Sequence, residues 1–243
     1  MTVGAARLWG VPVRPHSLER RRAIAALAAG QHGVVTLAQL RRLGLSKSAI
    51  YDRVGGRLHR AAFGVFAVGH PLLSIDGRRL AAVLSLGGDA VLSHLSAAAA
   101  WGLLDHDDAR FNVAVAHTSG GSTGASHVRP RRTRRLLIED RTTLREIPIT
   151  TVARTLLDLA GERGGRSVQR AVHEAEVLRL LDVTEVLATI QRNPGRRGAR
   201  LLRRAVGGPL TRPHQLAVRD GIRCALRATR LARSPARRPP RPG

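Results

Sequence analysis

The chain has 243 residues, enough for one large domain or two small ones, and its 43% hydrophobic but only 2% aromatic residues predict a Leu, Ala and Val core that favours helices over a β-sandwich. The formal net charge of +24 makes nucleic acid the leading partner, because like charges at this density repel one another until a polyanion neutralises them. The single cysteine, Cys224, excludes an intrachain disulfide framework and a cysteine-rich zinc site. The sequence shows no signal-like segment and no run of about 20 apolar residues, so we expect a soluble, cytoplasmic protein that does not enter a membrane.

The first elements expected along the chain are a flexible arm and a helix. Residues 1–17 contain two prolines and no periodicity, which is typical of an arm. From Ser17, which can cap a helix, apolar residues at helical spacing predict a first helix that Gly30 ends. The pair Val34 and Val35 then forms a short extended link.

Two further helices are expected next, separated by a tight turn. Thr36 is the predicted cap of the second helix, and Gly44 ends it. Ser46 is the predicted cap of a third helix, SKSAIYDRV, which Gly55 and Gly56 stop. After the glycines, the β-formers in AAFGVFAVG (residues 61–69) predict a small hairpin. Three helices followed by a β-ribbon describe a winged helix-turn-helix over residues 18–70.

Residues 71–209 are expected to form a helix-rich α+β domain, which makes the chain an α+β protein that is mainly helical. The helices near its end form either a dimer interface or the domain's own core. The predicted elements are helices at Ile75–Leu86 and Ser93–Leu104, a strand at Phe111–Ala116, a flexible loop at His117–His127, a hairpin over Arg129–Ile149 that Pro148 closes, a helix from Thr150 or Thr151 to Leu159, and helices at Val168–Leu181, Thr184–Ile190 and Ala199–Val206. Residues 210–243 form an Arg- and Pro-rich tail that we expect to be disordered or the product of a frameshift.

The third helix is the strongest candidate for a functional element, because a recognition helix needs an apolar face for the core and short polar or basic residues for base edges. The start of the hairpin could hold phosphates beside it. The alternative is a solvated surface that serves protein contacts. The candidate DNA-binding residues are Ser46, Lys47, Ser48, Tyr51, Arg53, Arg57, His59 and Arg60.

Two other charge patterns leave alternatives open. The run Arg129, Arg131, Arg132, Arg134 and Arg135 either touches nucleic acid or an acidic partner, or is a solvated hairpin edge. GC-rich codon usage also inflates Arg and Ala, and it accounts for part of the net charge.

A search for catalytic residues is negative, and we expect no enzyme, no cofactor and no metal. His94, His106 and His117 lack the i, i+4 spacing of helical metal ligands. The GGSTG segment at residues 120–124 lacks the Gly-Lys-Ser/Thr continuation and the strand-to-helix context of a phosphate-binding loop.

The N-terminal part of the chain resembles a known family. The segments GVVT, LGLSKSAIYDRV, LHRAAFGVFAVG and LSHLSAAAAWGLL, within residues 23–104, together resemble the N-terminal domain of AbiEi-type antitoxins of type IV toxin-antitoxin systems. The resemblance implies a winged helix that binds operator DNA and represses its own operon, and a cognate toxin as a second partner. It carries over to Ser46, Lys47, Tyr51, Arg53, Arg57 and Arg60.

The middle of the chain has a second resemblance. IPITTVARTLLDLAG, at Ile147–Gly161, resembles actinobacterial proteins in which such an N-terminus precedes a nuclease domain of the very-short-patch-repair type. No acidic metal-binding pattern follows Val206 here, so a truncated, catalytically inactive nuclease relative is the alternative to a DNA-binding regulator. A frameshift in GC-rich DNA would produce the tail. A basic adaptor that binds an acidic protein is the third possibility.

Overall fold

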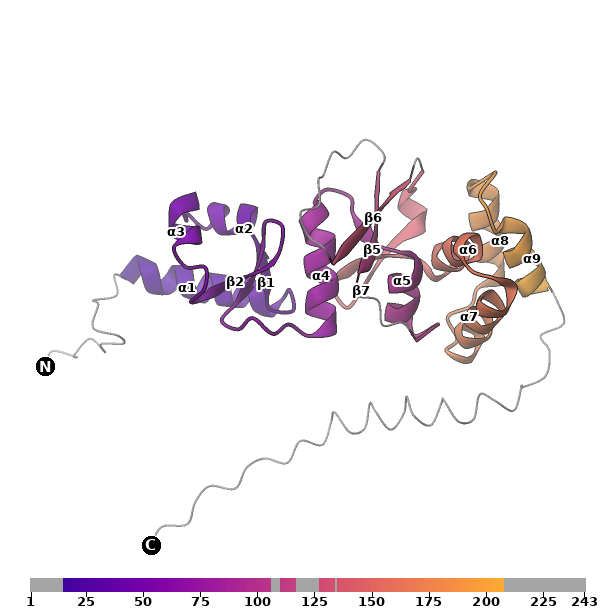
Figure 1. The fold of residues 1–243 in the computed structure, drawn as a ribbon, viewed down its shortest axis with the longest axis horizontal. Helices are drawn as coiled ribbons and strands as arrows, with labels where there is room; N and C mark the ends of the chain where they lie inside the picture. Colours follow the sequence, from indigo (N-terminus) through magenta and orange to yellow (C-terminus); the bar gives the residue numbers. More distant parts are fainter. Residues whose placement is uncertain (1–14, 106–109, 117–126, 134, 208–243) are drawn as a thin grey trace, which may run out of the picture. The chain divides into compact units, whose positions relative to one another are not determined.

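The computed structural model describes residues 15–105, 110–116, 127–133 and 135–207, which form an α+β fold with helices and two β-sheets (Figure 1). Apart from Gly207, these residues belong to a unit that ends at Val206. Most of the predicted arm, most of the predicted flexible loop and all of the predicted tail lie outside the described residues. The predicted domain boundary near residue 70 stays a prediction.

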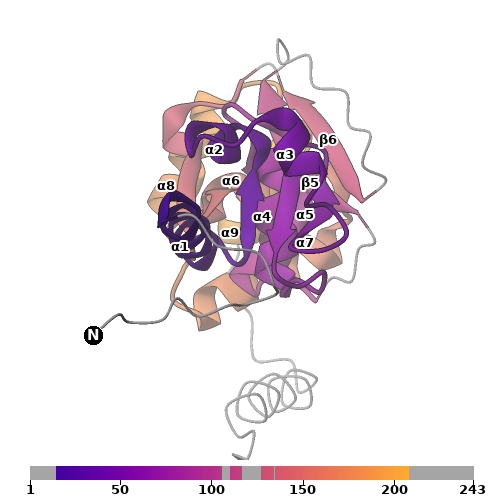
Figure 2. The ribbon, with the colours of Figure 1, turned by 90° about the vertical axis from the view of Figure 1, so that its left-hand side faces the viewer.

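The first part of the chain contains three helices and a three-stranded antiparallel sheet in the order β1-β3-β2. Figure 2 shows the short helices α2 and α3, which contact each other, beside the longer α1. The elements are α1 (Pro15–Ala29), β1 (Val34–Thr36), α2 (Leu37–Arg42), α3 (Lys47–Tyr51), β2 (Leu58–Ala62) and β3 (Val65–Val68).

Two details of this part differ from the sequence prediction. The first helix begins at Pro15, so Ser17 lies inside it instead of preceding it. The predicted link at Val34 and Val35 is a strand, because β3 supplies a partner for it: Val35 stands opposite Phe66.

The three-stranded sheet is buried on both faces. Leu40, Ile50 and Phe66 belong to a core cluster with residues of α1, so the three helices cover one face. Val34 and Val65 belong to a different cluster that contains residues of α4 (Ile75–Leu86), which therefore covers the other face. The sharp turn between α2 and α3 places Gly44 at a φ of 81°, a backbone conformation that glycine adopts without strain.

The second part contains a mixed five-stranded sheet in the order β6-β5-β4-β8-β7. The strands β5 and β6 pair in parallel, as do β4 and β8, and the other neighbours are antiparallel. α4 contacts strands of both sheets. The strands are β4 (Val91–Leu92), β5 (Phe111–Ala116), β6 (Val128–Thr133), β7 (Arg141–Leu144) and β8 (Ile147–Thr150), and a 3-10 turn, η1, spans Ile138–Asp140.

The hairpin predicted over Arg129–Ile149 is only partly correct. Its first strand, β6, pairs in parallel with β5, and the hairpin is the shorter β7-β8 pair that turns at Arg145 and Glu146. Pro148 does not close the hairpin but lies inside β8, opposite Thr143. A proline is tolerated there because β4 pairs with β8 only at Ile149, so little of the ladder on that side needs an N–H.

The remaining helices pack into a second core. Of the two predicted caps of α6, Thr150 and Thr151, it is Thr151 that caps the helix. Its side chain accepts a hydrogen bond from the N–H of Arg154. Buried residues of α5 to α9 share one cluster, so the helices from about residue 168 onward form the core of this part. They are α5 (His94–Trp101), α6 (Val152–Glu162), α7 (Gly165–Val177), α8 (Val183–Arg192) and α9 (Ala199–Gly207).

None of the helices in the part of the chain that the structure describes combines the length and the apolar character needed to cross a bilayer.

Candidate functional site

The N-terminus of α3 forms as the sequence predicts. Ser46 is extended, with φ of −69° and ψ of 158°, and its side chain accepts a hydrogen bond from the N–H of Ala49 at 3.1 Å. Ile50 is fully buried and anchors the helix in the core. Lys47 and Ser48 are exposed. The buried face and the polar face of the predicted helix are therefore both present.

The helix is shorter than predicted, because it ends at Tyr51 instead of continuing to the glycines. Backbone hydrogen bonds from Arg53 to Ile50 and from Val54 to Tyr51 tighten the chain into turns there. The guanidinium of Arg53 donates to the carbonyl of Ala49, one of the last carbonyls of the helix. Arg53 therefore lies after α3 and caps its C-terminal end.

Tyr51 connects α3 to the sheet. The guanidinium carbon of Arg60, on β2, lies 5.4 Å from the centre of the Tyr51 ring, which is within the range of a cation–π interaction. The same ring meets Phe66 edge-on, with 6.1 Å between ring centres. Tyr51 nevertheless keeps 38% of its surface exposed. The contact between Arg60 and Tyr51 thus joins α3 to β2 at the surface, and Ser46, Lys47, Ser48, Arg53 and Arg57 are exposed near them in the sequence. We call these seven residues the α3/β2 surface.

His59 is separated from this surface. It stands opposite Ala67 in the sheet, whereas its neighbour Arg60 stands opposite Phe66, and successive strand residues point to opposite faces. The exposed Arg57 lies just before β2. Phe63 lies in the turn between β2 and β3 with 66% of its surface exposed. The sequence indicates this residue only as a β-former.

The charge around the α3/β2 surface is unbalanced. Residues 15–70 contain nine arginine or lysine residues and two acidic residues, Glu19 and Asp52. Among the residues that the structure describes, every ion pair involves residues after position 75. The positive charge of this part is therefore not neutralised by carboxylates within the described chain.

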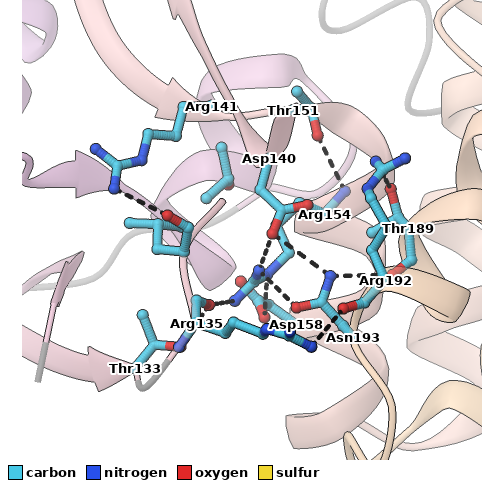
Figure 3. Close-up of polar contacts among 12 residues, drawn as sticks. Thr133, Arg135, Asp140, Arg141, Thr151, Arg154, Asp158, Thr189, Arg192 and Asn193 are labelled. Carbon is cyan, nitrogen blue, oxygen red and sulfur yellow. Dashed lines mark hydrogen bonds and ion pairs between the residues drawn. The ribbon is translucent and has the colours of Figure 1, made fainter. Parts of the chain in front are cut away.

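A second polar site, which the sequence analysis did not predict, is buried near α6. Arg154 is 1% exposed, and its guanidinium donates to the carboxylates of Asp140 and Asp158 and, at 3.1 Å, to the side-chain oxygen of Asn193 (Figure 3). Arg196 donates to the same oxygen of Asp158 at 2.6 Å. We call these five residues the Arg154 cluster.

The Arg154 cluster joins four parts of the chain: η1, α6, the end of α8 and the segment before α9. One signal for it exists in the sequence, since Arg154 and Asp158 stand four residues apart in an otherwise apolar helix and form an i, i+4 pair. Their partners Asp140 and Asn193 are distant in the sequence, which is why the cluster could not be assembled from spacing alone.

His94 lies close to the cluster at the start of α5. Its Nδ1 is 3.9 Å from Asp158, its Nε2 is 3.9 Å from Glu162, and its φ of 53° is unusual for a residue with a side chain. Burial is the main cause that lowers the pKa of His94 from its ordinary value; Asp158 and Glu162 oppose this, and Arg131 and Arg196 add to it. The surroundings of His94 therefore favour its neutral form.

The predicted absence of a metal site stays a prediction. Within the described ranges, no three His, Cys, Asp or Glu side chains gather in a way that could hold an ion, and His106 and His117 lie outside those ranges.

In the comparisons with known proteins, no protein-family model matches the chain, and none of the curated proteins matches it either.

Proposed function

We propose that this chain is a DNA-binding transcriptional regulator of the antitoxin type, which binds double-stranded DNA through a winged helix-turn-helix made of α1–α3 and the β2-β3 hairpin. The observation that carries the proposal is the α3/β2 surface, in which the contact between Arg60 and Tyr51 joins helix and hairpin into one exposed basic face. A recognition helix and a wing are used together in this way when they bind a duplex.

The distribution of charge supports the same proposal. Nine basic residues within 15–70 meet only two acidic ones, and they form no ion pair with a described carboxylate. A phosphate backbone supplies the missing negative charge and releases its own counterions when it is neutralised. In this proposal Lys47 and Tyr51 read base edges, while Arg57 and Arg60 contact phosphates.

The experiment compares a labelled duplex from the DNA upstream of the chain's own gene with a random duplex of equal length, by fluorescence anisotropy. Lys47→Ala should weaken binding to the upstream duplex by about 1–3 kcal/mol and leave binding to the random duplex nearly unchanged, because base contacts carry specificity. Tyr51→Phe isolates the hydroxyl, because it keeps the ring that packs on Phe66. Arg60→Ala should weaken binding to both duplexes alike.

Arg203→Ala is the matched control. Arg203 is an exposed arginine on α9, far in sequence from the proposed site, and it forms no ion pair with the residues that the structure describes. Its loss removes one positive charge from the chain, as the Arg60 change does. If the Arg203 and Arg60 variants bind both duplexes equally well, or if Lys47→Ala lowers affinity for both by the same factor, the proposed surface is wrong.

A further inference from the structure

A cavity of about 270 Å³ lies against the Arg154 cluster, and its lining is strongly basic. It is formed by α5, β5, β6, α6 and the segment before α9. Six polar or charged residues contribute to its walls: His94, Arg131, Arg132, Thr133, Arg154 and Arg196; Ala114 and Pro130 complete them. No acidic side chain is among these lining residues.

Two of the lining arginines are held in place by polar partners. Arg131 donates from Nε to Asn112 at 3.0 Å and contacts Glu162 through Nη2 at 2.5 Å, which leaves its Nη1 without an acceptor among the described residues. Arg196 donates to Asp158 and, at 3.0 Å, to the hydroxyl of Thr133. Arginines fixed in this way lose little further entropy when they bind a ligand.

The carboxylates that position the arginines lie behind them. Asp140 and Asp158 are almost fully buried and do not line the cavity. Arg132 follows Arg131 in β6 and stands opposite Val115, so its exposed side chain points to the other face of the sheet. The cavity therefore presents the N–H donors of Arg131, Arg154 and Arg196, with no acidic side chain in its walls.

Backbone strain marks the same place. The left-handed φ of His94 is the kind of unfavourable conformation that persists where the surrounding structure imposes it and that clusters at functional sites. Its imidazole shares one hydrogen bond with the hydroxyl of Ser93, at 3.0 Å, and forms part of the cavity wall.

We propose that this cavity binds a small oxyanion of the phosphate class, through Arg131 and Arg196. A planar guanidinium with two parallel N–H groups matches the spacing of phosphate oxygens, and charge-assisted hydrogen bonds of this kind are the strong ones. The site is separate from the α3/β2 surface, because none of its lining residues belongs to α1–α3 or β1–β3.

Calorimetric titration of the full chain with sodium phosphate, in a buffer that holds ionic strength constant with chloride, tests this proposal. Saturable binding is expected, and Arg131→Gln should weaken it about tenfold or more because a charge-assisted contact is lost. Arg129→Gln is the matched control: Arg129 is exposed on the same strand, β6, but does not line the cavity. An equal loss in both variants, or no saturable binding of phosphate, would overturn the proposal.

Two further measurements identify the site and the ligand. Phosphate in the cavity should shift the imidazole resonances of His94 more than those of His59, and an unshifted His94 would contradict the assignment. Lys47→Ala should leave phosphate binding unchanged, which separates this proposal from DNA binding. Repeating the titration with a nucleoside 5′-monophosphate distinguishes a bare phosphate site, with equal affinity for both, from a site that also holds the nucleoside and binds it more tightly.

Discussion

Arg154 is the residue on which most of the second part's polar structure depends. Its guanidinium is the shared partner of Asp140 and Asp158, and one oxygen of each of these carboxylates already has no hydrogen-bond partner among the described residues. Buried charges are costly to leave unpaired, because the low-dielectric interior does not replace the water that they have lost. The cluster is stable only as a complete set.

Arg154→Ala should therefore lower the free energy of unfolding by about 3–5 kcal/mol, since it leaves two carboxylates buried beside each other with a single remaining arginine. The measurement is urea unfolding of the full chain. Arg170→Ala is the control: Arg170 and Asp105 form an ion pair at 3.6 Å with side chains 52% and 95% exposed, and such surface pairs contribute about 1 kcal/mol or less. Comparable losses in the two variants would mean that the cluster does not stabilise the fold.

At the scale of elements, the connection between α8 and α9 is fixed by a close approach of two backbones. Gly198 has a φ of 87°, and a Cβ at this position would overlap the carbonyl group of Ala160 and the nitrogen of Gly161, in α6. Only glycine allows the segment before α9 to lie so near to α6. Arg196, in the same segment, thereby reaches both Asp158 and the cavity.

Gly198→Ala should be strongly destabilising, whereas Gly195→Ala should cost only the strain of a left-handed alanine, about 1–2 kcal/mol. Gly195 is a close control, because its φ is 75° and a Cβ there would meet nothing within 4 Å. The overlap at Gly198 should add at least about 1–3 kcal/mol to that strain. Thermal unfolding of both variants provides the comparison, and equal melting temperatures would refute the close approach.

Local signals account for the elements that the sequence predicts well. The bounds of α4 and β5 are those expected, because an apolar periodicity of one kind runs through each of them. Thr36 and Ser46 cap their helices as predicted, since a cap depends on residues three positions away: the Thr36 cap is completed by the side chain of Gln39.

The strand pairings that were missed depend on partners distant in the sequence. β1 is a strand because β3 pairs with it, and the polar sequence VRPRRT forms β6 because β5 offers it a parallel neighbour at the edge of the sheet. The same reason applies to the sites. The residues of the α3/β2 surface were found because they are nearly contiguous in the sequence. The cavity instead combines His94 with Arg131 and Arg196, which follow His94 by 37 and 102 residues.

At the scale of the whole molecule, the question is whether the net charge of +24 reflects function or codon usage. Codon usage would raise arginine content throughout, and it does: residues 71–207 contain 21 basic residues, but these are accompanied by 14 acidic ones. Residues 15–70 lack that compensation. The uneven distribution of carboxylates, more than the total of arginines, is therefore the argument for a polyanion partner in the first part.

A salt titration decides between a specific regulator and a chain that is merely basic. For the proposed regulator, log affinity should fall with log salt at a slope near −0.9 for each phosphate neutralised, on both the upstream and the random duplex, while the ratio of the two affinities stays well above one. Arg57→Ala combined with Arg60→Ala should make the slope about two units shallower if each side chain neutralises one phosphate. Equal affinity for both duplexes would leave only charge-driven association. Weak binding that salt does not change would instead favour an adaptor whose basic surface meets an acidic protein, because without counterion release the phosphate backbone is not the partner.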